Sequence, residues 1–73
     1  MNVQRIGGAA GAVWARLHEV EVGGTVSMLK RIDGFTGDEI VAGIGWLARE
    51  GKIDFQTVNK KTCVCLVEAE LYA

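Results

Sequence analysis

The stretch over residues 36–53, TGDEIVAGIGWLAREGKI, constrains the fold more than any other part of the sequence. Thr36 and Glu39 stand at the spacing of a capping box, which marks the N-terminus of a helix. Gly51 suits the left-handed conformation that commonly ends a helix. The residues after Gly51 alternate between polar and apolar side chains, as in a strand. The stretch therefore predicts a capped helix that leads through one glycine into a strand.

One face of this helix is predicted to be buried, because Ile40, Ile44 and Leu47 recur at helical spacing. The opposite face is small and apolar, with Trp46 at its flank and Arg49 as the only cation of the helix. Proteins that read DNA place hydrogen-bond donors on such a face. The composition of this face therefore favours contact with protein. The sequence leaves open whether Trp46 packs inside its own domain or at an interface.

The N-terminal part predicts a first helix that begins after Asn2, a suitable N-cap, and ends near residues 19–22. Three glycines in this helix (Gly7, Gly8 and Gly11) each cost roughly 1 kcal/mol relative to alanine. We therefore expect another backbone to approach the helix closely. The apolar residues that trace one helical face are Val3, Ile6, Ala10, Val13, Trp14 and Leu17.

The middle of the chain predicts the rest of a helix-turn-helix unit. Residues 25–26 are expected to form a very short strand that pairs with the later hairpin. Ser27 is expected to cap a second helix over residues 28–33, with Met28, Leu29 and Ile32 facing inward. Gly34 then supplies the turn into the third helix. Two helices joined by a short turn that contains glycine are typical of a helix-turn-helix.

The C-terminal part predicts a two-stranded hairpin over residues 52–58 and 62–67, with Asn59 in the connecting loop. The second strand does not alternate polar and apolar residues, so we expect both of its faces to be covered. A tail over residues 68–73 follows. The predicted fold class is α+β, with three helices, a short strand and a C-terminal two-stranded wing, in a single domain over residues 1–73.

The composition narrows the functional classes. Hydrophobic residues make up 49% of only 73 residues, so we expect part of the apolar surface to contact a partner. The net charge is −1, whereas nucleic-acid-binding domains generally carry an excess or a stripe of positive charge. No apolar run has membrane-spanning length and no signal-peptide pattern opens the chain. These features predict a cytoplasmic protein with no membrane partner.

No residue set has the pattern of a catalytic site, so we expect no enzymatic activity, no cofactor and no small-molecule substrate. The residues considered for zinc are His18, Cys63 and Cys65, but a structural zinc site takes four ligands at a recognisable spacing. Both cysteines lie in an apolar strand, where reduced thiols pack as small hydrophobic groups. A metal or redox function shared between two chains stands as a third, distant alternative.

Two segments carry a family resemblance: IGGAAGAVWARL at residues 6–17 and AGIGWLAREGKI at residues 42–53. Together they resemble a small bacterial and archaeal winged helix-turn-helix family of uncharacterised function, over nearly the whole chain. The resemblance implies the winged-helix fold. The broader superfamily implies either DNA binding or a protein-interaction role, so the choice between them depends on the residues of this chain.

The leading functional prediction is a protein-interaction module that self-associates as a homodimer. We expect the contact to involve the last strand and the tail, with Leu66, Leu71 and Tyr72 as anchors and Trp46 at the margin. If the last strand lies at a sheet edge, its free backbone groups also favour pairing with a second chain. An interface centred on the third helix is the alternative placement.

The second functional prediction is a transcription factor that binds DNA weakly through the wing and the third helix. Cations are needed at the phosphate backbone. Asp38 and Glu39, at the start of the third helix, are expected to oppose such binding. The candidate DNA contacts are Lys30, Arg49, Lys60 and Lys61.

Overall fold

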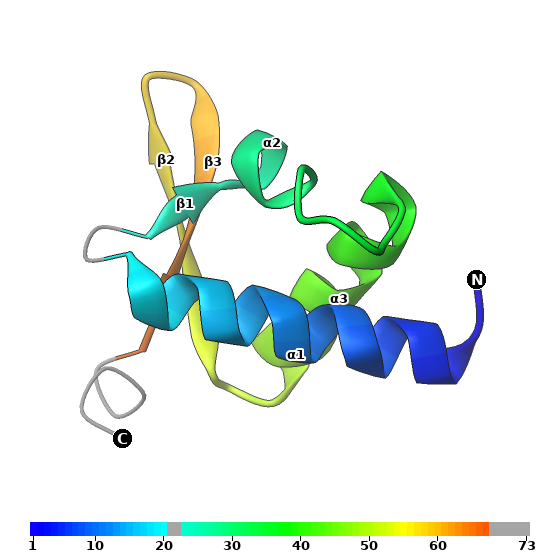
Figure 1. The fold of residues 1–73 in the computed structure, drawn as a ribbon. Coiled ribbons are helices and arrows are strands. Elements are labelled where there is room, and N and C mark those ends of the chain that lie inside the picture. Colours follow the sequence, from blue (N-terminus) through cyan, green and yellow to red (C-terminus); the bar gives the residue numbers. More distant parts are fainter. Residues whose placement is uncertain (21–22, 68–73) are drawn as a thin grey trace.

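The computed structural model describes residues 1–20 and 23–67, which form three helices and a three-stranded antiparallel sheet (Figure 1). The hairpin of the last two strands is the wing, beside the helix-turn-helix, so the predicted winged helix-turn-helix is confirmed. The elements in chain order are α1 (Val3–Glu19), β1 (Gly24–Thr25), α2 (Val26–Leu29), α3 (Gly37–Arg49), β2 (Ile53–Val58) and β3 (Lys61–Leu66).

The core lies between α1, α3 and one face of the sheet. The predicted inward stripe of α3 is confirmed, because Ile40, Ile44 and Leu47 are all buried. The predicted face of α1 needs one correction: Val3 is 68% exposed, because it lies in the first turn and the buried part of α1 begins only at Ala9. The buried apolar residues are Ala9, Ala10, Val13, Leu17, Leu29, Ile40, Ile44, Leu47, Ile53, Val64 and Leu66.

The closest approach between helices occurs at Gly43 of α3. A Cβ atom at this position would lie 2.7 Å from the backbone nitrogen of Ala10 and 3.0 Å from the carbonyl carbon of Ala9. The expected close approach is therefore present, but α3 supplies the glycine and α1 supplies alanines. At Gly7 and Gly11 of α1, a Cβ atom would meet no atom of the described chain within 4 Å.

The second helix begins earlier than predicted. Its N-cap is Thr25, whose hydroxyl accepts a hydrogen bond from the Met28 backbone N–H at 3.1 Å, and Ser27 lies inside the helix. Thr25 takes this role because it ends β1 in an extended conformation directly before the first helical turn. The shift also changes the inward face: Leu29 is buried as predicted, whereas Met28 is exposed.

The sheet has the order β1-β3-β2, with β3 in the centre. Val58 pairs with Lys61, and both residues of the intervening turn, Asn59 and Lys60, have positive φ, which is typical of a two-residue type I′ hairpin. The predicted pairing of a short strand with the hairpin is confirmed, since Thr25 pairs with Cys63, although the strand covers Gly24–Thr25 and Val26 belongs to α2. β3 is therefore not an edge strand, and the edge-pairing argument does not apply to it.

The two faces of β3 differ, which corrects the expectation that both are covered. Val64 and Leu66 point into the core and are buried. Cys63 and Cys65 alternate with them on the other face and are only half-buried, with free thiols. Three-strand pairing covers the backbone of β3, whereas its second face in the described structure is partly open.

Candidate protein-interaction surface

The N-terminus of α3 is fixed by a network around Glu39. The Thr36 hydroxyl accepts from the Glu39 backbone N–H at 3.1 Å, and the Glu39 carboxylate accepts from the Thr36 N–H at 2.9 Å, which confirms the capping box. Nε and Nη2 of Arg5 each donate to the same carboxylate at 2.9 Å. Arg5 also donates to the Gly34 carbonyl and lies over the Phe35 ring, 4.7 Å from its centroid.

Because of this network, the charge of Glu39 is buried and paired and does not lie on the surface. Hydrogen bonds from Arg5 and from the Thr36 backbone lower the pKa of Glu39 to about 2, and its side chain is 6% exposed. The expectation that Glu39 repels phosphate is therefore wrong, because its charge faces Arg5 of α1. Asp38 is the acid in the first turn of α3 that is exposed.

The face of α3 that points away from the core carries exposed apolar side chains. Val41 is 44% exposed and Trp46 is 41% exposed. Between them, a Cβ atom at Gly45 would meet nothing within 4 Å in the part of the chain that the structure describes. We call the surface that carries Val41, Gly45 and Trp46 the outward face; it is apolar apart from Asp38 and Arg49 at its two ends.

A groove of about 380 Å³ runs between α1 and α3, beside the outward face. Trp46 lines this groove, so its indole ring belongs both to the groove and to the exposed flank of α3. Lys52 lies near the other indole, with Nζ 5.7 Å from the centroid of the Trp14 ring. The residues that line the α1–α3 groove are Gly7, Ala10, Gly11, Trp14, Trp46, Leu47, Glu50 and Lys52.

The structure separates the residues predicted for dimer contact. Leu66 is only 7% exposed and packs in the core of its own chain, because it pairs with Ile53 on the inner face of the central strand. It is therefore not a surface anchor, which corrects that prediction. Leu71 and Tyr72 lie outside the described residues. Trp46 is the predicted contact that the structure places at an accessible surface.

The residues predicted for DNA contact are all exposed but lie in three places. Lys60 and Lys61 stand at the tip of the wing. The Lys30 side chain lies beside Gly37 at the start of α3, whereas Arg49 ends the same helix. Because a helix of 13 residues is about 20 Å long, Lys30 and Arg49 do not form one patch.

Comparison with known proteins decides the family. Residues 1–66 match a family model described as a winged helix-turn-helix domain, DUF2582, whose function is unknown. The chain belongs to this family. The solution NMR structure of protein BT2368 from Bacteroides thetaiotaomicron is similar to this DUF2582 domain, with a TM-score of 0.75 and 29% sequence identity. The match covers 90% of this chain and 79% of that chain. None of the curated proteins compared with the chain matches it.

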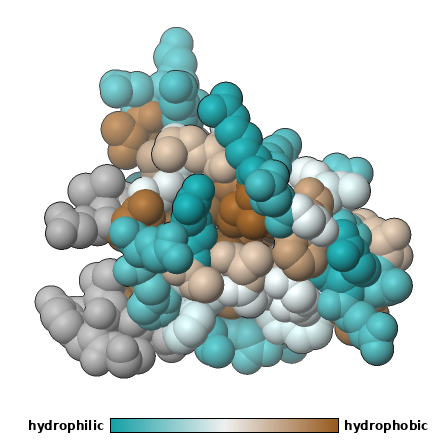
Figure 2. Space-filling model, viewed as in Figure 1, coloured by the Kyte–Doolittle hydropathy of each residue, from teal (hydrophilic) through white to brown (hydrophobic). Residues whose placement is uncertain are grey.

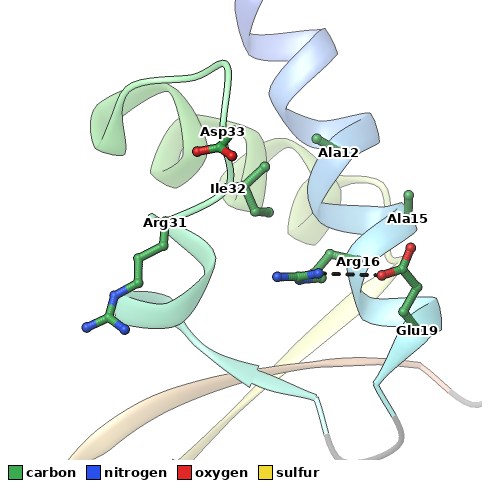
Figure 3. A pocket seen from close by; sticks show the side chains of 7 residues that line it. All are labelled: Ala12, Ala15, Arg16, Glu19, Arg31, Ile32 and Asp33. Atoms are coloured by element: carbon green, nitrogen blue, oxygen red, sulfur yellow. Dashed lines mark ion pairs between the residues drawn. The ribbon is translucent and has the colours of Figure 1, made fainter.

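A second depression in the DUF2582 domain lies between α1 and the segment after α2 (Figure 3). Two cations and two acids line its rim: Arg16 and Glu19 form an exposed ion pair at 3.5 Å, and Arg31 and Asp33 follow α2. Figure 2 shows hydrophobic surface at the centre of this face between hydrophilic side chains. The charges of this rim balance, so the depression has no preference for an anionic ligand.

The described part of the DUF2582 domain lacks both a metal-binding group and a membrane-spanning helix. Within residues 1–20 and 23–67, no three His, Cys, Asp or Glu side chains gather into a group that could hold a metal ion. No helix in the same ranges is long and apolar enough to cross a membrane.

The groove is the feature that the sequence prediction missed. Its two walls come from helices that are far apart in the chain, so no local sequence pattern predicts the groove. The available signal was the cost of Gly7 and Gly11, two helical glycines that no close contact in the described structure requires.

Proposed function

We propose that this DUF2582 domain is a non-enzymatic protein-interaction module that forms a homodimer through the outward face of α3. The observation that carries the proposal is the exposure of two large apolar side chains of α3, Val41 and Trp46. Exposed apolar patches on small domains mark interaction sites. Tryptophan is also enriched among the residues that contribute most to binding free energy. Winged-helix families are typically non-enzymatic, which supports the same reading.

A contact through the edge of the wing has less support. β2 is the edge strand of the hairpin, and the Phe55 backbone N–H donates to the Asp54 carboxylate at 2.8 Å. A side chain that occupies an edge N–H, together with its charge, discourages pairing with another strand. A helical interface related by a twofold axis uses the same patch twice and leaves no open surface for further growth.

The test is sedimentation equilibrium over a range of micromolar concentrations. We expect the wild-type chain to form a dimer, and Trp46→Arg to raise its dissociation constant at least about 30-fold, since hot-spot residues contribute about 2 kcal/mol or more. Val58→Arg is the matched control, because Val58 is a similarly exposed apolar residue near the wing tip. A wild-type chain that sediments as a monomer at high micromolar concentration would contradict the proposal, as would equal effects of both substitutions.

Weak DNA binding is the second candidate, and the observation that favours it is the exposed pair Lys60 and Lys61 at the wing tip. We expect no specific operator, and a dissociation constant for random duplex no tighter than ~10⁻⁴–10⁻⁶ M at physiological salt. Lys60→Ala with Lys61→Ala should weaken this binding equally for all sequences, because both side chains would contact phosphate. Fluorescence anisotropy with labelled duplex measures it. Nanomolar binding to one selected sequence would reverse the ranking of the two functions.

A further inference from the structure

We infer that the α1–α3 groove receives Trp46 of a second copy of this chain, so that the two Trp46 rings pack together across a twofold axis. In this arrangement each ring covers Gly7 and Gly11 of the other copy. The inference rests on the proposed homodimer and assigns its contacts. A contact through the outward face of α3 alone would not involve α1, whereas in this arrangement α1 forms half of the interface.

The glycines of α1 supply the first argument. Glycine is among the least favourable residues in a helix interior. Gly43 has a reason within the chain, because Ala9 and Ala10 press against it. A Cβ atom at Gly8 would lie 3.3 Å from the Phe35 ring. Gly7 and Gly11 face only open space within the described chain, although both line the groove. Because Gly7 and Gly11 lie about one turn apart and carry no side chain, a bulky group from outside can approach the helix backbone closely at the groove.

Shape supplies the second argument. The groove measures about 380 Å³, and a cavity of about 150 Å³ already accepts a benzene ring. An indole ring therefore fits in it. The same surface carries Trp46, which is 41% exposed at the groove wall. An exposed ring next to a hollow large enough for a second ring is self-complementary under a twofold axis, since each copy offers both parts. Aromatic pairs in offset or edge-to-face contact add to the affinity beyond the area they bury.

Charge supplies the third argument, and it favours a second copy over a nucleic acid or an acidic protein. The groove contains one acid, Glu50, and one cation, Lys52. A phosphate backbone would meet one repulsive and one attractive charge here, so it would gain no net attraction from the groove. A second copy brings the same two charges in reversed direction, so Glu50 of each copy can lie near Lys52 of the other. Such complementarity fixes the register of an interface more than it adds affinity.

The experiment uses Gly7→Ala combined with Gly11→Ala, because the two roles of these glycines predict effects of opposite sign. The methyl groups should raise the urea midpoint of unfolding of the diluted, monomeric chain, since alanine is the better helix former. The same methyl groups should occupy the space of the partner ring and raise the dimer dissociation constant at least tenfold. The emission of the tryptophans should shift to the red at the concentration at which the dimer dissociates.

Gly37→Ala is the matched control. Gly37 begins α3 outside the groove, and its Cβ would make ordinary contacts of 3.6 Å or more with Lys30. We expect this variant to leave the dissociation constant unchanged. A dimer that Trp46→Arg disrupts, but that the double alanine variant leaves intact, would overturn the groove inference and keep the proposed function. A monomeric wild-type chain would overturn both. A lowered unfolding midpoint in the double variant would show that these glycines serve their own chain, and would also overturn the inference.

Discussion

Gly43→Ala is expected to lower the free energy of unfolding by about 2 kcal/mol, although alanine is the better helix former. Overpacking a close contact costs roughly 1–3 kcal/mol, and the upper end applies here because the obstructing atoms are backbone. The added Cβ would lie 2.7 Å from the Ala10 nitrogen and 3.0 Å from the Ala9 carbonyl carbon, so α1 must move away from α3. The gain in helix propensity offsets about 1 kcal/mol of this cost.

Gly45→Ala is the control on the same helix, two residues away. Its Cβ would meet nothing within 4 Å in the described part of the chain, so only the propensity gain of about 1 kcal/mol remains. The stabilities of both variants are measured by thermal unfolding at a concentration at which the chain is monomeric. For a domain of this size, 2 kcal/mol corresponds to a decrease in Tm of roughly 8–16 °C for Gly43→Ala. Equal Tm values for the two variants would show that the helices separate without cost.

Features that depend on neighbouring residues were predictable from the sequence. The capping box of Thr36 and Glu39 and the positive φ of Gly51 at the end of α3 both follow from local hydrogen bonding and backbone conformation. The start of α2 was not predictable in the same way. Thr25 and Ser27 are both suitable N-caps. Which of them is used depends on where β1 ends, and that is fixed by pairing between Thr25 and Cys63.

Features that depend on contacts between distant parts of the chain could not be predicted from the sequence. The chain has five glycines within helices α1 and α3 away from their ends, and nothing local distinguishes Gly43, which meets a backbone, from Gly11, which does not. Leu66 looks equally suited to a core and to an interface until the strand order places β3 in the centre. The α1–α3 groove likewise forms only when α1 packs against α3, and the residues that these two helices contribute to it are more than thirty positions apart in the sequence.

Glu39 shows the same limit for charge. Its position in the first turn of α3 predicts the capping role correctly, but its partner Arg5 lies 34 residues earlier. Local sequence therefore suggests an exposed acid, whereas the folded chain holds a buried carboxylate in a bidentate ion pair. This contact joins the start of α1 to the turn of the helix-turn-helix through Arg5 and Gly34. It also makes the stability of the fold sensitive to acid.

We expect the domain to lose stability as pH falls from about 4.5 toward 2. The pKa of Glu39 is lowered from its ordinary value of 4.5 to about 2, chiefly by the hydrogen bonds from Arg5 and then by the Thr36 backbone. Between these values the unfolded chain binds a proton at this carboxyl and the folded chain does not, so acid favours unfolding. The contribution of Glu39 is fully present above pH 4.5 and is lost as pH falls through about 2.

Glu39→Gln isolates this contribution, because the amide oxygen can still accept from the Thr36 N–H but carries no charge for Arg5. The variant should be less stable than the wild type at pH 7, and the difference should shrink as pH falls toward 2, where the wild-type carboxyl is protonated too. Asp38→Asn is the control, since Asp38 is an exposed acid in the same helical turn. Urea unfolding followed by circular dichroism at several pH values between 2 and 7 measures the three curves. If Glu39→Gln and the wild type stay separated by a constant free energy down to pH 2, the ion pair with Arg5 is not what holds the start of α3 against α1.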